Sequence, residues 1–204
     1  MTAYPSMRNY YYDSKRERLL EQYIESMEAI DVIDMEENEE PPACQYTGVE
    51  QDTGMEQQGI EEGEEEGIEK VWPVEATLSI EKIDLMLPVL SGATKEHLNV
   101  SAASIENTGK PWQGNNYAVA GHRSRAFGSH FNRVNELKIG DEIVVTDSEK
   151  NRYIYEVFSK QIVDAKEISV LEDTGVSQIT LITCDPPYVK NPPTRLVVKG
   201  KQIN

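Results

Sequence analysis

The second part of the chain alternates short apolar runs with polar turns, which is the pattern of a β protein. Residues 76–81 and 83–90 form two such runs in close succession. Residues 141–147 and 153–164 alternate apolar and polar side chains on either side of a polar turn at 148–151, which predicts a β-hairpin. These segments predict four strands.

Three further apolar runs lie beside a chemically active residue. Tyr117–His122 ends on a histidine, Gln178–Cys184 ends on a cysteine, and Thr194–Val198 carries an arginine at its start. The two prolines at 186 and 187 cannot continue a sheet ladder, so the second of these strands must end near Cys184. The total of about seven or eight strands with little helix predicts an all-β fold, a closed or nearly closed barrel.

Two short helical segments interrupt the strands. A helical turn is expected over 94–98, where His97 lies among charged residues and is expected to face solvent. A short helix is predicted over 129–137, with an apolar face made by Phe131, Val134 and Leu137. His130 lies next to that face and is expected at the surface.

The first part of the chain has a different character. Residues 13–35 repeat apolar side chains at helical spacing, through Leu19, Leu20, Tyr23, Ile24, Met27, Ile30 and Ile33. Such an amphipathic helix docks on the folded domain, pairs with a second copy, or lies along a membrane surface. The Glu-, Gln- and Gly-rich residues that follow predict a disordered linker, and their spacing does not match an EF-hand calcium loop. The predicted organisation is a helical segment over 1–35, an acidic linker over 36–70 and a folded domain over 71–204.

The acidic charge of the chain is local. The net charge is −16, and counting along the sequence places 20 acidic and 5 basic residues in 1–70, leaving 16 and 15 in the remainder. The chain has no basic stripe, which argues against nucleic-acid binding. It contains no apolar run of about eighteen residues, so no membrane span or signal peptide is predicted within it. The aromatic opening around Tyr10–Tyr12 predicts a native membrane anchor upstream, or else an aromatic terminus that packs on the domain.

Cys184, His122 and Arg195 supply a nucleophile, a base and a cation. A thiol is largely protonated at neutral pH, so a nucleophilic cysteine requires a base or cation beside it. Singly, each residue has an ordinary interpretation, as a small buried side chain, a turn histidine and a solvated edge charge. A disulfide between Cys184 and Cys44 is not expected, because Cys44 lies in the low-complexity stretch.

The Thr-Leu-Ile-Thr-Cys run ending at Cys184, the Gly-His pair ending at His122 and the arginine eleven residues after the cysteine resemble the sortases, cysteine transpeptidases of Gram-positive bacteria. The resemblance covers roughly residues 72–204 and implies an eight-stranded β-barrel. It implies cleavage of a Leu-Pro-x-Thr-Gly signal between Thr and Gly, with Cys184 as nucleophile, His122 as acid and base, and Arg195 as oxyanion partner. Weaker candidates for lining a peptide groove, bordered by 165–177 and 185–194, are Ala118, Ala120, Thr180 and Ile182.

The resemblance further implies partners and a location. The partners are proteins with an LPxTG-like sorting signal and an amine acceptor, on a peptidoglycan precursor or elsewhere. The enzyme would work at the extracellular face of the membrane through an anchor, with no cofactor and no metal. No lid of the kind found in pilin polymerases is recognised, which favours class A or class D. The alternatives are a plain cysteine peptidase and a catalytically silent barrel that binds peptides.

Overall fold

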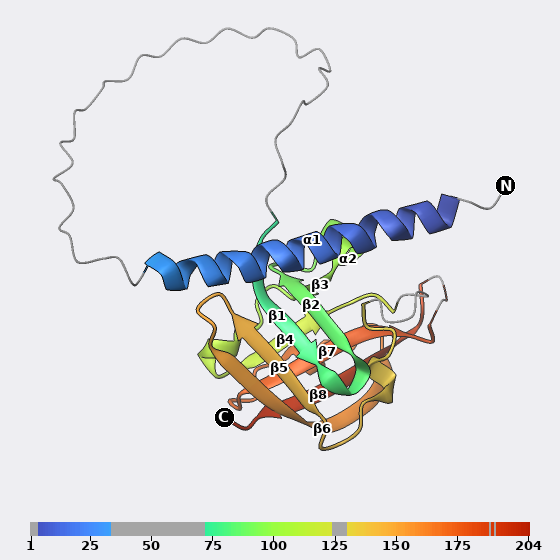
Figure 1. Ribbon diagram of the computed structural model, residues 1–204. Coiled ribbons are helices and arrows are strands. Elements are labelled where there is room, and N and C mark those ends of the chain that lie inside the picture. Colours follow the sequence, from blue (N-terminus) through green and yellow to red (C-terminus); the bar gives the residue numbers. More distant parts are fainter. Residues whose placement is uncertain (1–3, 34–71, 124–129, 188, 190) are drawn as a thin grey trace, which may run out of the picture.

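The described residues contain eight strands that close into a barrel in the computed structural model, in the order β1-β2-β3-β4-β7-β8-β6-β5 (Figure 1). The structure describes residues 4–33, 72–123, 130–187, 189 and 191–204, and in the N-terminal helix it describes the side chains of residues 11–25. The strands are β1 (Val74–Ile80), β2 (Leu85–Leu90), β3 (Ala102–Ser104), β4 (Asn116–Ala120), β5 (Glu142–Asp147), β6 (Arg152–Asp164), β7 (Gln178–Asp185) and β8 (Thr194–Gln202). The predicted all-β barrel is therefore confirmed.

Most neighbouring strands in the barrel are antiparallel, and two pairs are parallel. The predicted hairpin forms as β5 and β6, and β1 pairs with β2 in the same antiparallel way. β2 pairs with β3, and β4 pairs with β7, in parallel. The parallel β4–β7 pair determines where the candidate site lies, because it brings the C-terminal ends of two strands that are distant in sequence to the same end of the barrel.

Alternation along each strand separates a core face from an outer face. The barrel interior is filled by side chains that are almost completely buried, among them Leu78, Ile80, Leu87, Tyr117, Val119, Val145, Tyr155, Ile179, Leu181 and Val198. Because Ile179 and Leu181 point inward, Thr180, Ile182 and Cys184 point to the outer face of β7. Cys184 therefore stands outside the core at the end of its strand.

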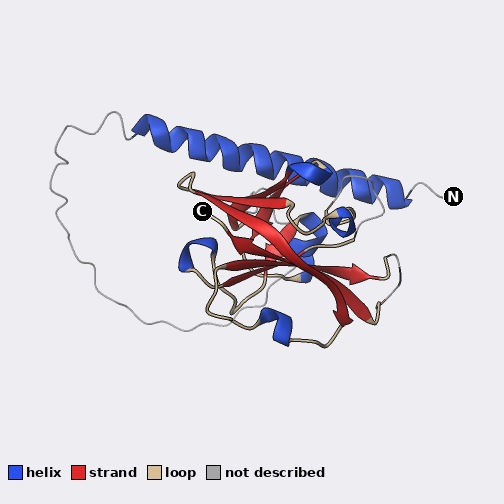
Figure 2. Ribbon diagram, turned by 90° about the horizontal axis from the view of Figure 1, so that it is seen from below, coloured by secondary structure: helices blue, strands red, loops and turns tan. Residues whose placement is uncertain are grey.

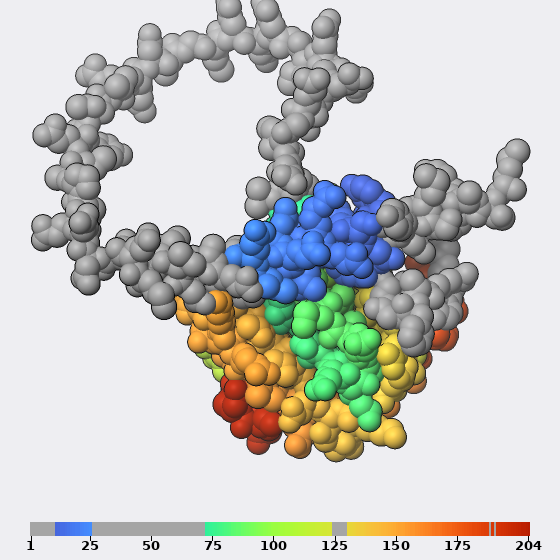
Figure 3. Space-filling view, viewed as in Figure 1, coloured from blue at the N-terminus to red at the C-terminus, as the bar shows by residue number. Residues whose placement is uncertain are grey.

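The N-terminal helix docks on the barrel. α1 (Tyr4–Ile33) lies across the outside of the barrel over β1, β2 and α2 (Figures 1 and 2). Its Leu19 joins a second cluster of buried apolar side chains with Leu90, Val100 and Ala103. The Tyr23 hydroxyl donates to the carbonyl oxygen of Glu75 at 3.2 Å. Of the three placements considered for this helix, the structure shows docking on the folded domain. Figure 3 shows the helix lying on the barrel surface.

The helix begins nine residues earlier than the predicted start at Asp13. Pro5 lies in its first turn, where the missing N–H of proline would be unpaired in any case. No glycine or further proline interrupts the chain between that turn and Ile33. The tyrosines of the aromatic opening are therefore helical. Among the described residues, no helix combines the length and apolarity needed to cross a membrane.

The helical turn expected at 94–98 is α2 (Lys95–Val100), and Thr94 caps it by accepting the His97 backbone N–H at 3.1 Å. The predicted exposure of His97 is only partly correct, because the residue is partly rather than fully exposed. Its ring lies edge-on to Trp72 with 5.8 Å between centroids, and its Nδ1 lies 2.7 Å from the carbonyl oxygen of Gly92. The Trp72 ring, which is distant in sequence, partly covers this histidine, and the local sequence does not show that contact.

The helix predicted over 129–137 is also wrong. The described part of this segment contains only a 3-10 turn, η3 (Val134–Glu136), although Phe131, Val134 and Leu137 are completely buried as expected. His130 adopts a φ of 51°, a left-handed conformation that interrupts a helix. His130 is 6% exposed, so the expectation of a surface residue is wrong as well.

β3 went unpredicted because it is only three residues long and carries no alternating pattern of its own. The predicted linker over 36–70 lies outside the described residues, as does Cys44.

Candidate active site

Two strands that run side by side in the same direction bring Cys184 and His122 to one end of the barrel. The parallel pairing of β4 with β7 ends at Ala120 opposite Ile182, and each candidate lies two residues further along its own segment of the chain. The Gly121 N–H continues the contact by donating to the Ile182 carbonyl oxygen at 3.1 Å. The thiol and the imidazole are thus carried by matching positions on neighbouring strand ends.

Arg195 lies directly opposite Cys184 across the antiparallel β7–β8 ladder. Side chains of such an opposed pair project to the same face of the sheet. The Arg195 Nη1 donates to the carbonyl oxygens of Pro192 and Thr194, at 2.9 and 2.8 Å. One nitrogen of the guanidinium therefore already holds the chain that leads into β8. Cys184, a free thiol, and Arg195 are both partly exposed.

The close approach of the Phe131 ring explains why residue 121, just before the histidine, is a glycine. A Cβ atom at this position would lie 2.7 Å from the Phe131 ring, closer than side-chain atoms approach each other. Further along the chain, the Phe131 N–H donates to the His122 carbonyl oxygen at 3.0 Å. Phe131 thus packs against the strand end and holds the His122 backbone, while the His122 side chain is exposed to solvent.

His130 is a buried neighbour of the candidate base. The His122 and His130 rings meet edge to face, with 6.3 Å between centroids and 63° between planes. Burial lowers the pKa of His130 to about 3, and the positive charges of Arg16 and His122 act in the same direction. His130 is therefore neutral at physiological pH. In the part of the chain that the structure describes, its Nδ1 is buried without a hydrogen-bond partner.

An ion pair links the residues that directly follow the two candidates. The Arg123 Nη1 lies 2.7 Å from the Asp185 Oδ1, and the two side chains are 10% and 20% exposed. Sequence reasoning missed this pair, and it placed His130 at the surface rather than buried beside His122. The signal for the pair in the sequence was that a cation, Arg123, directly follows His122, and an anion, Asp185, directly follows Cys184.

The four groove candidates divide into two sets. Ala118 and Thr180 are completely buried, whereas Ala120 and Ile182, one step nearer the thiol, are partly exposed. All four lie on the outer face of the β4–β7 pair, Ala118 opposite Thr180 and Ala120 opposite Ile182. Only the second pair is accessible from the side of the thiol.

Asn116 explains why the first pair is covered. Its Nδ2 donates to the carbonyl oxygens of Val170 and Glu172, at 3.0 and 3.1 Å, which ties the segment between β6 and β7 onto this face. Its Oδ1 accepts the Thr180 hydroxyl at 2.7 Å. This segment includes η4 (Ser169–Leu171), whose Val170 is buried. The segment therefore lies on the outer face at the start of β4, the end of the strand away from Ala120.

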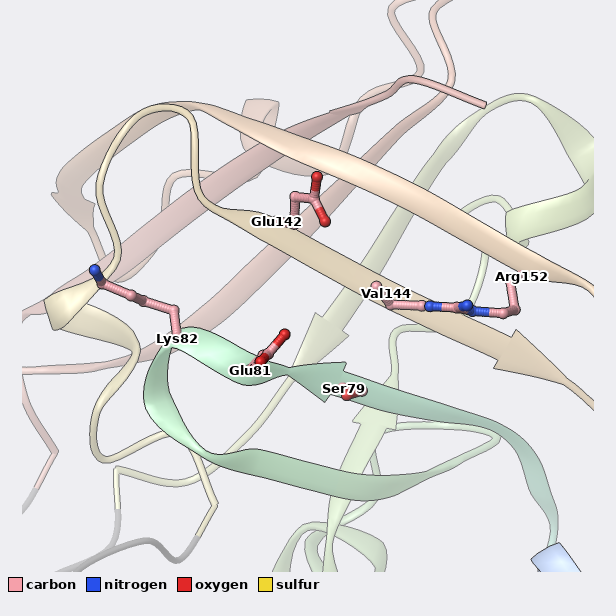
Figure 4. A pocket seen from close by; sticks show the side chains of 6 residues that line it. All are labelled: Ser79, Glu81, Lys82, Glu142, Val144 and Arg152. Carbon is pink, nitrogen blue, oxygen red and sulfur yellow. The ribbon is translucent and has the colours of Figure 1, made fainter.

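An open depression elsewhere on the barrel is chemically different. It lies on the outer face of β1, β5 and β6, and its lining includes the carboxylates of Glu81 and Glu142 and the cations of Lys82 and Arg152 (Figure 4). These charged residues are all exposed. None of the three candidate catalytic residues contributes to it, and its lining contains no thiol.

The geometry at the ends of β4, β7 and β8 fits acyl transfer through a thiol. A histidine beside a cysteine can accept the thiol proton and later return it to a leaving group. An arginine on the opposite side of the cysteine can stabilise the oxygen of a tetrahedral intermediate. The groove surface beside the thiol would hold the acyl part of a substrate.

Comparisons with known proteins agree with this chemistry. A family model described as "Sortase domain" matches residues 78–203. A protein named sortase A from Bacillus anthracis is 38% identical over 126 residues, which cover 62% of this chain and 58% of that protein, less than two thirds of its length. The structure of sortase A from Listeria monocytogenes is 30% identical with a TM-score of 0.59, covering 65% of this chain and 88% of that one. A sortase D5 transpeptidase from Clostridium perfringens is 27% identical with a TM-score of 0.57, covering 64% and 79%.

Proposed function

The chain belongs to the sortase family, and we propose that it is a cysteine transpeptidase that cleaves an LPxTG-like sorting signal between Thr and Gly. The observation that carries this proposal is the position of Cys184 on β7, with the end of β4 and His122 on one side and Arg195 of β8 on the other. A candidate nucleophile, base and cation thus lie on neighbouring strand ends, which supports the proposal.

The first half of the reaction makes a thioester. His122 accepts the proton of the Cys184 thiol, and the sulfur attacks the carbonyl carbon of the substrate threonine. The carbon–sulfur bond forms while the carbonyl π electrons move to the oxygen. When the carbonyl re-forms, the carbon–nitrogen bond breaks, and His122 gives its proton to the departing glycine amine. The acyl group then remains on Cys184.

The second half releases the thioester to an amine. The acceptor nitrogen attacks the same carbonyl carbon, His122 accepts the amine proton, and the carbon–sulfur bond breaks to regenerate the thiol. Water in place of the amine would give hydrolysis, which is the plain peptidase alternative. We propose an amine on a peptidoglycan precursor, or another surface amine, as the acceptor.

Arg195 acts on the oxygen that becomes negative in both halves. A guanidinium that is fixed before the reaction stabilises this oxyanion without reorganising at the moment of attack. The bonds from Nη1 to the Pro192 and Thr194 carbonyls provide that fixation. The remaining donors of the planar guanidinium would meet the oxyanion.

The sorting peptide would lie over Ala120 and Ile182, next to the thiol. The buried pair Ala118 and Thr180 would support the wall formed by the segment between β6 and β7 rather than touch the peptide. The segment between β7 and β8 would border the other side. We propose that residues 71–204 are the catalytic domain, preceded by the helical segment 1–35 and the acidic linker 36–70. We place the enzyme at the extracellular face of the membrane.

A ligation assay tests the proposal. The protein is incubated with a dye-labelled peptide containing Leu-Pro-x-Thr-Gly and with a triglycine acceptor, and products are identified by mass spectrometry. The proposal predicts a peptide joined to triglycine after the threonine. Cleavage without incorporation of the amine would favour the plain peptidase. Binding of the peptide without any cleavage would favour the silent peptide-binding barrel.

A further inference from the structure

We infer that the ion pair between Arg123 and Asp185 is a clamp that positions His122 against Cys184 and offsets a negative charge beside the thiol. The inference rests on the proposed function, because it concerns the same site. Arg123 directly follows His122 and Asp185 directly follows Cys184, and their side chains meet at 2.7 Å. Both residues act through their neighbours, so they are positioning residues.

The clamp extends a series of contacts between the two strand ends. The β4–β7 ladder ends at Ala120 opposite Ile182. Beyond it, the Thr183 hydroxyl donates to the Gly121 carbonyl oxygen at 2.8 Å. The ion pair continues this series past both catalytic residues. The segments that carry the base and the nucleophile are thereby joined on either side of the reacting groups.

Both ends of the clamp are anchored in the fold. Arg123 forms an isolated antiparallel bridge with His130, and Asp185 pairs with Thr194 at the end of the β7–β8 ladder. The side chains are 10% and 20% exposed, so water screens their attraction less than it screens a surface pair. Rates of acyl transfer depend steeply on the placement of the base. A shift of about 1 Å lowers them by up to roughly 100-fold.

The clamp also controls charge. The Asp185 carboxylate is one residue from the thiol, and an unpaired negative charge there opposes formation of the thiolate. The Arg123 guanidinium offsets that charge. Arg123→Gln and Asp185→Asn break the same contact, but the first leaves an unpaired carboxylate and the second leaves an unpaired guanidinium. Loss of positioning should lower the acylation rate in both variants. The change in charge should shift the pH dependence of the thiol in opposite directions in the two variants.

The experiment uses the full chain with Cys44→Ala, so that alkylation reports on Cys184 alone, since the chain has 2 cysteines. The pH dependence of alkylation by iodoacetamide reports the effect of charge on the Cys184 thiol. The rate of single-turnover acylation by a sorting-signal peptide reports the positioning of His122. We expect Arg123→Gln to move the alkylation midpoint up by about half to one pH unit and Asp185→Asn to move it down. We expect both to slow acylation by roughly 10- to 100-fold.

Two further variants make the test specific. Exchanging the charges, with Arg123→Asp and Asp185→Arg together, should recover at least about a tenth of the wild-type acylation rate and exceed both single variants. Arg152→Gln removes the same charge from the exposed depression on β5 and β6, and should change neither readout. Circular dichroism of each variant should match the wild type.

The inference is overturned if both single variants acylate within twofold of the wild type, or if both alkylation midpoints move in the same direction. Failure of the exchanged pair to exceed the single variants also overturns it. A wild-type protein that forms no acyl adduct contradicts the proposed function instead. The alkylation midpoints still decide the charge part of the clamp in that case, because they require no substrate.

Discussion

Cys184 and Arg195 face each other as a directly opposed pair in the antiparallel ladder between β7 and β8. A pair fixed by backbone register keeps its spacing through the reaction, because moving one member requires shifting a whole strand. The His122 backbone is fixed in a comparable way, by the β4–β7 pairing and by its bond to Phe131. With these backbone positions fixed, only rotation of the side chains remains free. Such a fixed backbone provides the preorganisation that electrostatic stabilisation of a transition state requires.

Arg195→Ala tests whether the arginine acts on the transition state. Loss of an oxyanion donor lowers kcat by roughly two to three orders of magnitude, so we expect that loss with little change in KM. Arg195→Lys keeps the charge but lacks the planar set of donors, so recovery should be partial. Single-turnover acylation is the measurement.

Arg195 also holds the carbonyls of Pro192 and Thr194, which offers a different explanation for any effect. If holding that segment is its only role, Arg195→Ala should raise KM and leave kcat nearly unchanged. That outcome would remove Arg195 from the mechanism. An acylation rate equal to the wild-type rate would do the same.

Cys184→Ala should abolish acyl transfer and leave the barrel folded. The thiol points to the outer face of β7 and is partly exposed, so its removal creates no core cavity. Cys44→Ala is the matched control and should retain full activity. Turnover assays on both proteins, with thermal melts to confirm folding, provide the comparison. Measurable turnover by Cys184→Ala contradicts the assignment of the nucleophile.

His130 predicts an acid-sensitive fold. Its folded pKa of about 3 lies below the unfolded value of 6.5, so between those values the unfolded chain binds more protons than the folded chain. Stability therefore falls as the pH drops through this window. The contribution of His130 to that loss is about 2 kcal/mol at pH 5. It is absent above pH 7, where the residue is neutral in both states.

His130→Gln removes this titration. Urea unfolding at pH 7 and pH 5 should show a smaller loss of stability in the variant than in the wild type, by about 2 kcal/mol. The comparison of slopes is independent of any change in stability at neutral pH. Equal losses in the two proteins would contradict the buried, neutral state of His130.

The docking of α1 predicts that the helix adds stability to a barrel that folds without it. Leu19 is 8% exposed and packs with Leu90, Val100 and Ala103, so Leu19→Ala should lower stability by about 1–3 kcal/mol. Gln22→Ala, at an exposed position of the same helix, is the control. Hydrogen exchange should show lost protection in α1 and unchanged protection in β7.

A shortened chain that starts near Val71 gives the complementary test. The main core lies inside the barrel and includes none of the α1 side chains that the structure describes, so this chain should fold and keep its candidate catalytic residues in place. Its melting temperature should be lower, because the cluster around Leu90 becomes exposed. An unfolded product would show that the helix belongs to the core and that the predicted domain boundary is wrong.

The sequence predicts the strands well where a single pattern decides them. The β-branched run before Cys184 and the prolines after it specify a strand that ends at this residue, and the structure ends β7 at Asp185. Alternation around residues 148–151 specifies the β5–β6 hairpin in the same way. In both cases local pattern and tertiary pairing agree.

Pairing between distant segments is not contained in these local patterns. The parallel match of β4 with β7, which aligns His122 with Cys184, depends on the closure of the whole barrel. The resemblance to a known family, rather than any periodicity, brought the three catalytic candidates together. His130 shows the converse error, since a polar residue beside an apolar face was expected at the surface, whereas it is buried and has a left-handed backbone conformation.

The central claim is that Cys184 forms a thioester with the threonine of a sorting signal, and the mass of the intact protein tests it most directly. The protein is mixed with a Leu-Pro-x-Thr-Gly peptide, quenched in acid and digested to locate the modification. We expect the added mass of the peptide up to its threonine, on Cys184, with loss of the adduct when triglycine is added. An unmodified Cys184, with the peptide cleaved or intact, would contradict the account.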